Sequence, residues 1–268
     1  MTFRSRLALL LALAWPAAAQ ADAQVICTLI MEIGGPALLE TGDCDGRVTP
    51  ASTFKVPLAL IGYATGRLVD DRTPVMIWRK GEPDWGGAAW TQADVTPAHW
   101  MRHSVLWYSQ RLAHDLGAAA LTAHAQAMDY GNADFSGDPG KGNGLDRAWV
   151  SSSLKISPRE QARFIARLAT GDLPYDTAAL ARTHALLGPI EVDGWTVRGK
   201  TGSAFPRKAD GAFDHARGWG WYVAWAERDG RRLALVRLTQ AVARSKTPHG
   251  IATRDRFLAD LPGLLAPR

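Results

Sequence analysis

The sequence has no apolar run long enough to cross a bilayer. Its longest run, Leu7–Trp15, falls well short of the roughly 20 apolar residues that a spanning helix needs. Arg4 and Arg6 precede this run and small residues 17–19 follow it, which is the pattern of a secretory signal peptide. We expect a signal peptide over 1–19, with residues 21–23 as a second cleavage site and a membrane anchor as the less favoured alternative. The pattern predicts a periplasmic or secreted protein without stable membrane association.

Charge is also sparse and scattered. The chain carries 31 basic and 26 acidic residues, a formal net charge of +5, and loss of Arg4 and Arg6 would leave 29 basic residues and a charge of +3. A balance this mild, without clusters of lysine or arginine, argues against nucleic acid as a partner. Residues 20–268 suffice for one large domain with a substantial core.

Only two cysteines occur, Cys27 and Cys44. The stretches "ICTLIMEI" and "ALLETGDCD" resemble two strands that flank a turn at residues 34–36. If this hairpin is symmetric about its turn, the two cysteines face each other across it. In an exported protein such a pair favours a disulfide, and two free buried thiols remain the alternative.

Common hydrolase patterns are missing as well. The chain has no G-x-S-x-G elbow, and none of its seven histidines lies in an evident catalytic triad or in an H-E-x-x-H zinc pattern. We therefore predict no metal site and no Ser-His-Asp hydrolase. No glutamate lies between Glu82 and Glu160, and Glu160 is expected to form a capping box with Ser157 at the start of a helix.

Strand patterns cluster at the two ends of the chain and helical patterns fill the middle. After the N-terminal hairpin, helices are expected from residue 52, over 97–117, over 117–129 and from Pro158, and a last helix over about 253–265. Strands are expected in "GWTVRGKTGSAF", "GWYVAWAE" and "RRLALVRLTQ", with a turn at Asp229-Gly230. This order predicts an α+β fold with an antiparallel sheet built from both chain ends, flanking helices and an inserted helical lobe. The α/β lobe would cover about 24–62 and 175–268, and the helical lobe about 63–174.

The stretch "GWTVRGKTGS", residues 194–203, satisfies two patterns at once. It fits the G-x-x-x-x-G-K-[ST] phosphate-binding loop, which requires a helix after it. Gly202 and Pro206 leave no room for that helix, and residues 195–198 favour a strand. The alternative is the K-T-G strand of serine enzymes that recognise penicillin.

The K-T-G interpretation predicts an S-x-x-K motif earlier in the chain, and "PASTFKVP" supplies it. Ser52 and Lys55 are three residues apart, so one helical turn places both side chains on one face. A serine hydroxyl needs a base beside it, and Lys55 can serve only if its amine is neutral. Burial among residues 54, 105, 106 and 149, with a second cation at Lys200, would disfavour its charged form.

With these motifs, the sequence resembles the class D serine β-lactamases over essentially the whole chain after the leader. The matching stretches are residues 52–55, "SVL" at 104–106, "YGN" at 130–132, Trp149 followed by "SSLKIS", K-T-G at 200–202, "GWYVAW" at 220–225 and a late arginine in "ARSKTPHG". The resemblance implies the α/β sandwich of penicillin-recognising serine enzymes. It also implies hydrolysis of the β-lactam ring of penicillins and related antibiotics, which gives resistance.

The resemblance further implies a role for each matching residue. Ser52 would be the nucleophile, Ser104 would carry a proton to the leaving nitrogen with help from Lys200, and the backbone N–H groups of Ser52 and Ser203 would bind the oxyanion. Thr201 and Arg244 would bind the substrate carboxylate, with Arg237 as a rival to Arg244. Val105 and Trp149 would line the site, and Tyr130 and Asn132 would form its structural edges.

Lys55 is expected to carry carbon dioxide as a carbamate (N6-carboxylysine), held by the Trp149 indole N–H and serving as general base. No other cofactor is expected. Class A relatives use a glutamate from the middle of the chain for deacylation, and its absence here favours the carbamate. Two positions depart from the family pattern: Leu106 replaces the valine of S-x-V, and Ala224 replaces a common glycine.

Two other functions remain open from the motifs. One is a β-lactam sensor that stays acylated, and the other is a small penicillin-binding D,D-peptidase. The sequence leaves open the substrate range, the inhibitor sensitivity and the choice between monomer and homodimer.

Overall fold

The computed structural model describes residues 23–266, so the expected signal peptide lies outside the described residues. A six-stranded sheet runs through the molecule in the order β2-β1-β6-β5-β4-β3, and every neighbouring pair is antiparallel. The strands are β1 Ala23–Glu32, β2 Ala37–Gly42, β3 Pro189–Val192, β4 Trp195–Ala204, β5 Trp219–Arg228 and β6 Arg231–Ala241. The first hairpin pairs directly with the last strand, which confirms the predicted α+β class and the sheet from both chain ends.

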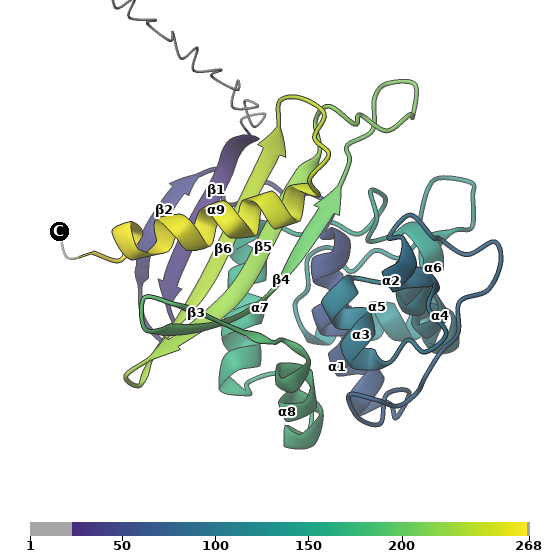
Figure 1. The fold of residues 1–268 in the computed structure, drawn as a ribbon, viewed down its shortest axis with the longest axis horizontal. Helices are drawn as coiled ribbons and strands as arrows, with labels where there is room; N and C mark the ends of the chain where they lie inside the picture. The colour runs from purple at the N-terminus through teal and green to yellow at the C-terminus, as the bar shows by residue number, and fades with distance from the viewer. Residues whose placement is uncertain (1–22, 267–268) are drawn as a thin grey trace, which may run out of the picture.

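Helices cover both faces of the sheet (Figure 1). On one face lies α9, His249–Leu264, and on the other lies α7, Pro158–Thr170. Because of this double cover, β6 is buried from Leu233 to Ala241 without alternation. The remaining helices gather to one side of the sheet in Figure 1. They are a 3₁₀ turn η1 Ala51–Phe54, α1 Lys55–Ala64, α2 Ala88–Thr91, α3 Pro97–His103, α4 Leu106–Leu116, α5 Ala118–Ala127, α6 Gly144–Arg147 and α8 Thr177–Leu186.

Local sequence signals account for several element ends. Ser157 caps α7 by accepting from the Glu160 N–H, and the Glu160 side chain accepts from the Ser157 N–H, so the predicted capping box is confirmed. Asp229 and Gly230 both have positive φ, at 49° and 77°, as a tight turn between β5 and β6 requires. The helix α9 begins at His249, four residues before the expected start.

The N-terminal hairpin differs from the symmetric pairing that we expected. Cys27 lies opposite Gly42 rather than Cys44, because Met31 pairs with Ala37 and the turn is therefore centred near Gly34, not between Gly35 and Pro36. The chain turns after β2 and brings Cys44 back, so that a disulfide still joins Cys27 to Cys44 with 5.1 Å between the Cα atoms. The disulfide therefore ties the end of β2 to the middle of β1.

Two apolar clusters form the core, one on each side of the sheet. The larger one joins the sheet to α1, α4 and α7, and the smaller one lies under α9 around Tyr222 and Phe257. Among residues 23–266, no helix has the length and apolar character that a bilayer-spanning segment needs.

Candidate active site

Ser52 and Lys55 lie where the chain enters the first helix. Ala51 has a positive φ of 53°, and the 3₁₀ turn that follows places Ser52 one turn before Lys55, the first residue of α1. The Lys55 side chain is completely buried. Burial, together with the charge of Lys200, holds the pKa of the Lys55 amine well below its ordinary value. The amine is therefore suited to act uncharged.

Two buried nitrogen atoms in this region have no hydrogen-bond partner among the described residues, the Lys55 Nζ and the Trp149 Nε1. Trp149 is fully buried and its ring stacks on Phe54, with 5.3 Å between the ring centroids. A buried N–H without an acceptor is costly. A carboxylate-like group on Lys55 fits this arrangement, because its oxygen would accept the indole N–H. The nitrogen of Lys55 would then be uncharged and the added group would carry the negative charge.

Ser104 lies between two helices that the sequence pattern predicts as one. It has left-handed backbone angles, φ 60° and ψ 32°, and so ends α3 just before α4 begins at Leu106. The Trp90 indole donates to the His103 carbonyl at 2.9 Å and holds this corner. The Ser104 Oγ accepts a hydrogen bond from Lys200 Nζ at 2.8 Å. The break in the helix is what presents the serine to the K-T-G strand.

Lys200 lies on β4 and also donates to the Thr201 carbonyl at 3.1 Å. Burial, with a smaller contribution from the charge of Arg254, lowers its pKa to about 7. Near neutral pH the amine can therefore hold or release a proton beside Ser104. The structure thus brings Ser104 and Lys200 together, as expected from the motifs.

The K-T-G strand approaches the nucleophile through a glycine. A Cβ placed on Gly202 would come within 2.8 Å of the Pro50 carbonyl oxygen and 3.2 Å of the Thr53 nitrogen. Only glycine lets β4 lie this close to the 3₁₀ turn. The neighbouring Ser203 Oγ accepts from the Gly250 N–H on α9 at 2.8 Å, so this side chain is bound to α9. Its backbone N–H remains the expected oxyanion donor.

The three arginines near this end of the sheet have different surroundings. Arg237, the rival for carboxylate binding, is buried under α9 and donates to the Thr28 hydroxyl and to the Asp260 carboxylate. Arg244 is exposed in the connection between β6 and α9. Arg254, which the sequence reasoning missed, is close enough to Lys200 to lower its pKa. Its guanidinium pairs with the neighbouring Asp255, and no motif in the sequence indicates Arg254.

Tyr130 and Asn132 brace the neighbouring loop. The buried Tyr130 hydroxyl accepts from Gln161 Nε2 at 3.3 Å, and Gln161 also donates to the Thr53 hydroxyl at 2.8 Å. Asn132 donates to the Ser153 carbonyl and accepts from the Lys155 N–H. Gln161 was not singled out from the sequence, and it links the loop to the turn that carries Ser52.

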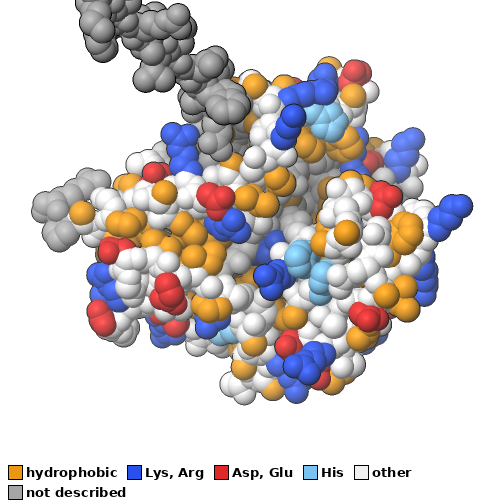
Figure 2. Space-filling view, viewed as in Figure 1, with side chains coloured by type: hydrophobic (Ala, Val, Ile, Leu, Met, Phe, Trp, Pro, Cys, Tyr) orange, Lys and Arg blue, Asp and Glu red, His pale blue; other side chains and the backbone are white. Residues whose placement is uncertain are grey.

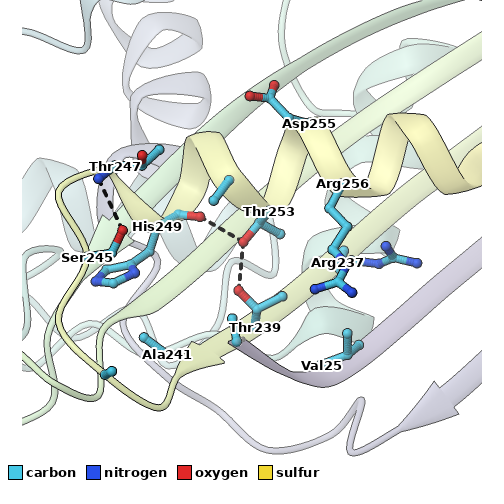
Figure 3. A pocket seen from close by; sticks show the side chains of 13 residues that line it. Val25, Arg237, Thr239, Ala241, Ser245, Thr247, His249, Thr253, Asp255 and Arg256 are labelled. Atoms are coloured by element: carbon cyan, nitrogen blue, oxygen red, sulfur yellow. Dashed lines mark hydrogen bonds between the residues drawn. The ribbon is translucent and has the colours of Figure 1, made fainter. Parts of the chain in front are cut away.

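Figure 2 shows a hollow between the sheet and the helical side of the molecule, with basic and histidine side chains on its walls. A different cavity, of about 430 Å³, lies on the α9 face of the sheet and is lined by β6 and α9. Arg237 and Arg256 project into it, and the Thr239 and Thr253 hydroxyls bond to each other beside them (Figure 3). Ser52, Lys55, Ser104 and Lys200 are absent from its lining, so it is separate from the candidate active site.

Comparison with known proteins agrees with this geometry. The penicillin binding protein transpeptidase domain matches residues 35–261. β-Lactamase OXA-9 of Klebsiella pneumoniae is 40% identical over 242 residues, covering 89% of this chain and 88% of that protein. The crystal structure of OXA-427 class D β-lactamase is 42% identical with a TM-score of 0.83, covering 89% of this chain and 98% of that chain. The chain belongs to the class D β-lactamases. The crystal structure of the class D β-lactamase of Bacillus subtilis, 26% identical, has a TM-score of 0.73 and covers 92% of this chain and 94% of that one.

Substitution of Gly202 tests the close approach in this class D enzyme. Gly202→Ala should lower kcat/KM about tenfold to a hundredfold. The new Cβ must push β4 away from Pro50 and so displace Thr201 and Ser203, the neighbours of Gly202 on the strand. Steady-state kinetics on a good penicillin substrate measure the effect. Gly188→Ala, where a Cβ meets nothing within 4 Å, is the matched control. Unchanged kinetics in Gly202→Ala would contradict the proposed fit.

The lowered pKa of Lys200 predicts a cost in stability. Its pKa is about 7 in the folded chain, against about 10.4 in the unfolded chain, so the unfolded state binds more protons between these values. The free energy of unfolding should therefore rise with pH from about 7 to about 10. Lys200→Met should stabilise the protein by about 1 to 4 kcal/mol at pH 7 and by progressively less toward pH 10.

Denaturant unfolding of the bicarbonate-free protein at several pH values measures this difference. The exposed Lys208→Met variant is the control and should follow the pH dependence of the wild type. A Lys200→Met variant that is less stable than the wild type at pH 7 would contradict the burial argument.

Proposed function

We propose that this protein hydrolyses the β-lactam ring of penicillins and related antibiotics through an acyl-enzyme on Ser52, and so gives resistance. The family and its relatives named as β-lactamases support the reaction class. The single observation that carries the assignment is the fully buried Lys55, one turn after the serine, whose pKa lies well below its ordinary value. Lys200, whose charge acts on Lys55, donates a hydrogen bond to Ser104.

The Lys55 amine takes up carbon dioxide in this proposal. Carbamylation forms a bond between Nζ and the carbon and releases one proton, and it supplies a carboxylate base near Ser52. The lowered pKa of Lys55 supports the step, because only the neutral amine reacts. The unpartnered indole N–H of Trp149 would donate to the new carboxylate.

Ser52 then attacks the β-lactam carbonyl after losing its proton to that base. The backbone N–H groups of Ser52 and Ser203 stabilise the oxyanion. As the ring opens, Ser104 donates a proton to the leaving nitrogen and regains one from Lys200, whose Nζ lies 2.8 Å from its Oγ. Deacylation repeats the attack with water in place of Ser52.

The substrate carboxylate needs a hydroxyl and a cation at the end of the K-T-G strand. Thr201 supplies the hydroxyl in this proposal. We assign the cation to Arg244, which is exposed in the connection between β6 and α9, and keep Arg254 as the rival, since its charge acts on Lys200 while its guanidinium pairs with Asp255. Export to the periplasm or medium belongs to the same proposal and rests on the leader-like residues 1–19.

Loss of Ser52 tests the reaction itself. Ser52→Ala should lower the turnover of nitrocefin and benzylpenicillin about a thousandfold or more, since the acyl-enzyme cannot form. Steady-state rates measure turnover, and intact-protein mass spectrometry of penicillin-treated enzyme measures formation of the acyl-enzyme. A stoichiometric burst without turnover in the wild type would instead support the sensor, and release of D-alanine from a cell-wall peptide would support the peptidase. Wild-type rates in Ser52→Ala would overturn the nucleophile assignment.

Loss of the Trp149 N–H tests the carbamate. Trp149→Phe keeps a ring against Phe54 but removes one hydrogen bond to a charged group, so half-maximal reactivation should need about tenfold to a hundredfold more bicarbonate. Enzyme dialysed in degassed acidic buffer is titrated with bicarbonate while penicillin turnover is measured. Trp195→Phe, in the core under α9, is the control. Turnover that is indifferent to bicarbonate in the wild type would remove the carbamate from the mechanism.

A further inference from the structure

The segment that follows Trp149 is held in an unfavourable backbone conformation. Ser151 has a φ of 62°, in the left-handed region that residues with a Cβ seldom adopt. Such a residue persists only where its surroundings fix it. The backbone that carries Trp149 therefore depends on the contacts made by residues 149–152 to keep this conformation.

Contacts from the interior fix one side of this segment. The Thr49 hydroxyl donates to the Trp149 carbonyl at 2.7 Å, and the Ser151 N–H donates to the same hydroxyl at 3.0 Å. The Thr49 carbonyl in turn accepts from the Trp221 indole at 2.9 Å. This side is tied to the central sheet.

Contacts from the continuation of β4 fix the other side. The Phe205 N–H donates to the Ser151 Oγ at 3.1 Å, and Arg207 Nε donates to the Ser151 carbonyl at 3.5 Å. The Ser152 hydroxyl donates to Asp138 Oδ1 at 2.8 Å. The strained segment is thus enclosed between Thr49 and a second layer of polar groups.

That second layer is joined by one ion pair, which we call the Asp138–Arg207 bridge. Arg207 Nη2 donates to Asp138 Oδ2 at 2.9 Å, with the two side chains 35% and 25% exposed. Arg207 also donates to the Gly211 carbonyl at 2.9 Å and lies 4.2 Å from the centroid of the Phe213 ring. Asn143 donates to the same oxygen of Asp138 at 3.1 Å. The guanidinium is held on several sides, unlike most surface ion pairs.

The electrostatics of Asp138 agree with this placement. Burial works to raise its pKa, but the bonds from Ser152 and Asn143 and the charges of Arg207 and Arg147 outweigh burial and hold the pKa below its ordinary value. Asp138 is therefore ionised throughout the neutral range and pairs with Arg207 there.

We propose that the Asp138–Arg207 bridge is a positioning element that holds the Trp149 indole N–H in place for the carbamate on Lys55. The inference rests on the proposed function. The bridge connects β4, which carries Lys200 and Ser203, to the segment that carries Trp149, so both walls of the site share one support. Arg207 and Asp138 act through Ser151 and Ser152 and do not touch the substrate.

The bicarbonate requirement of the enzyme tests this role. Arg207→Ala and Asp138→Asn should each raise the bicarbonate concentration for half-maximal turnover about fivefold, the size expected for loss of a partly exposed charge-assisted contact. The double variant should show less than the product of the two single effects, since both changes break the same bridge while each also affects a contact of its own with Ser151 or Ser152. Arg207→Lys should recover part of the loss, because it keeps the charge but not the forked contacts.

A second readout separates positioning from general destabilisation. Carbamate occupancy is followed by ¹³C NMR with labelled bicarbonate in the wild type and in each variant. Arg231→Ala, which breaks a comparable Arg–Glu pair with Glu32 at the far end of the hairpin, is the matched control and should keep wild-type occupancy. One result is that the wild type shows a carbamate signal while Arg207→Ala and Asp138→Asn keep its carbamate occupancy and its bicarbonate dependence. That result would overturn this inference and leave the proposed function standing. A wild type without any carbamate signal would overturn the proposed function and this inference with it.

Discussion

The constraint on which this site depends is the burial of the Lys55 amine away from any partner among the described residues. Moving an ammonium ion out of water costs several kcal/mol, so the fold can bury this side chain only by driving it neutral. Phe54, the residue before Lys55, is equally buried and stacks on the buried Trp149. A neutral, unpartnered amine is at once a defect in stability and a reactive group, and the protein retains the first in order to have the second.

The two lysines of the site differ because their surroundings differ. Lys55 has no partner among residues 23–266, whereas Lys200 donates to the Ser104 hydroxyl and to the Thr201 carbonyl. The charge of Lys200 disfavours the charged form of Lys55, whereas Lys200 itself keeps acceptors that stabilise a proton. In the proposed mechanism the two amines take opposite roles, Lys55 as the attachment point of a base and Lys200 as a proton donor.

Local signals in the sequence were sufficient for much of the fold. The capping box at Ser157, the tight turn at Asp229-Gly230 and the long apolar strands depend on neighbouring residues alone, and all were predicted. The S-x-x-K and K-T-G motifs fixed the residues at the centre of the site, because their spacing is a property of one helical turn and one strand.

Features that depend on distant contacts could not be predicted in the same way. The corner at Ser104 interrupts a continuous helical pattern because Trp90 and Lys200, from other segments, bind there. The predicted hairpin register was wrong by two residues because the turn is centred near Gly34, and the run of turn-forming residues 34–36 does not by itself determine which residue is the centre. The same holds for Arg237, whose partner Asp260 is on another element.

The site is held together mainly by backbone contacts between elements. Gly202 lies between the 3₁₀ turn of Ser52 on one side and Gly250 of α9 on the other, since a Cβ on Gly250 would lie 2.5 Å from the Gly202 carbonyl oxygen. The Ser203 hydroxyl completes this stack by accepting the Gly250 N–H. Because α9, β4 and the nucleophile turn touch through glycines, none of them can shift alone. This stack also explains the early start of α9: the contacts of Gly250 with β4, rather than helix propensity or a side-chain cap, fix where the helix begins.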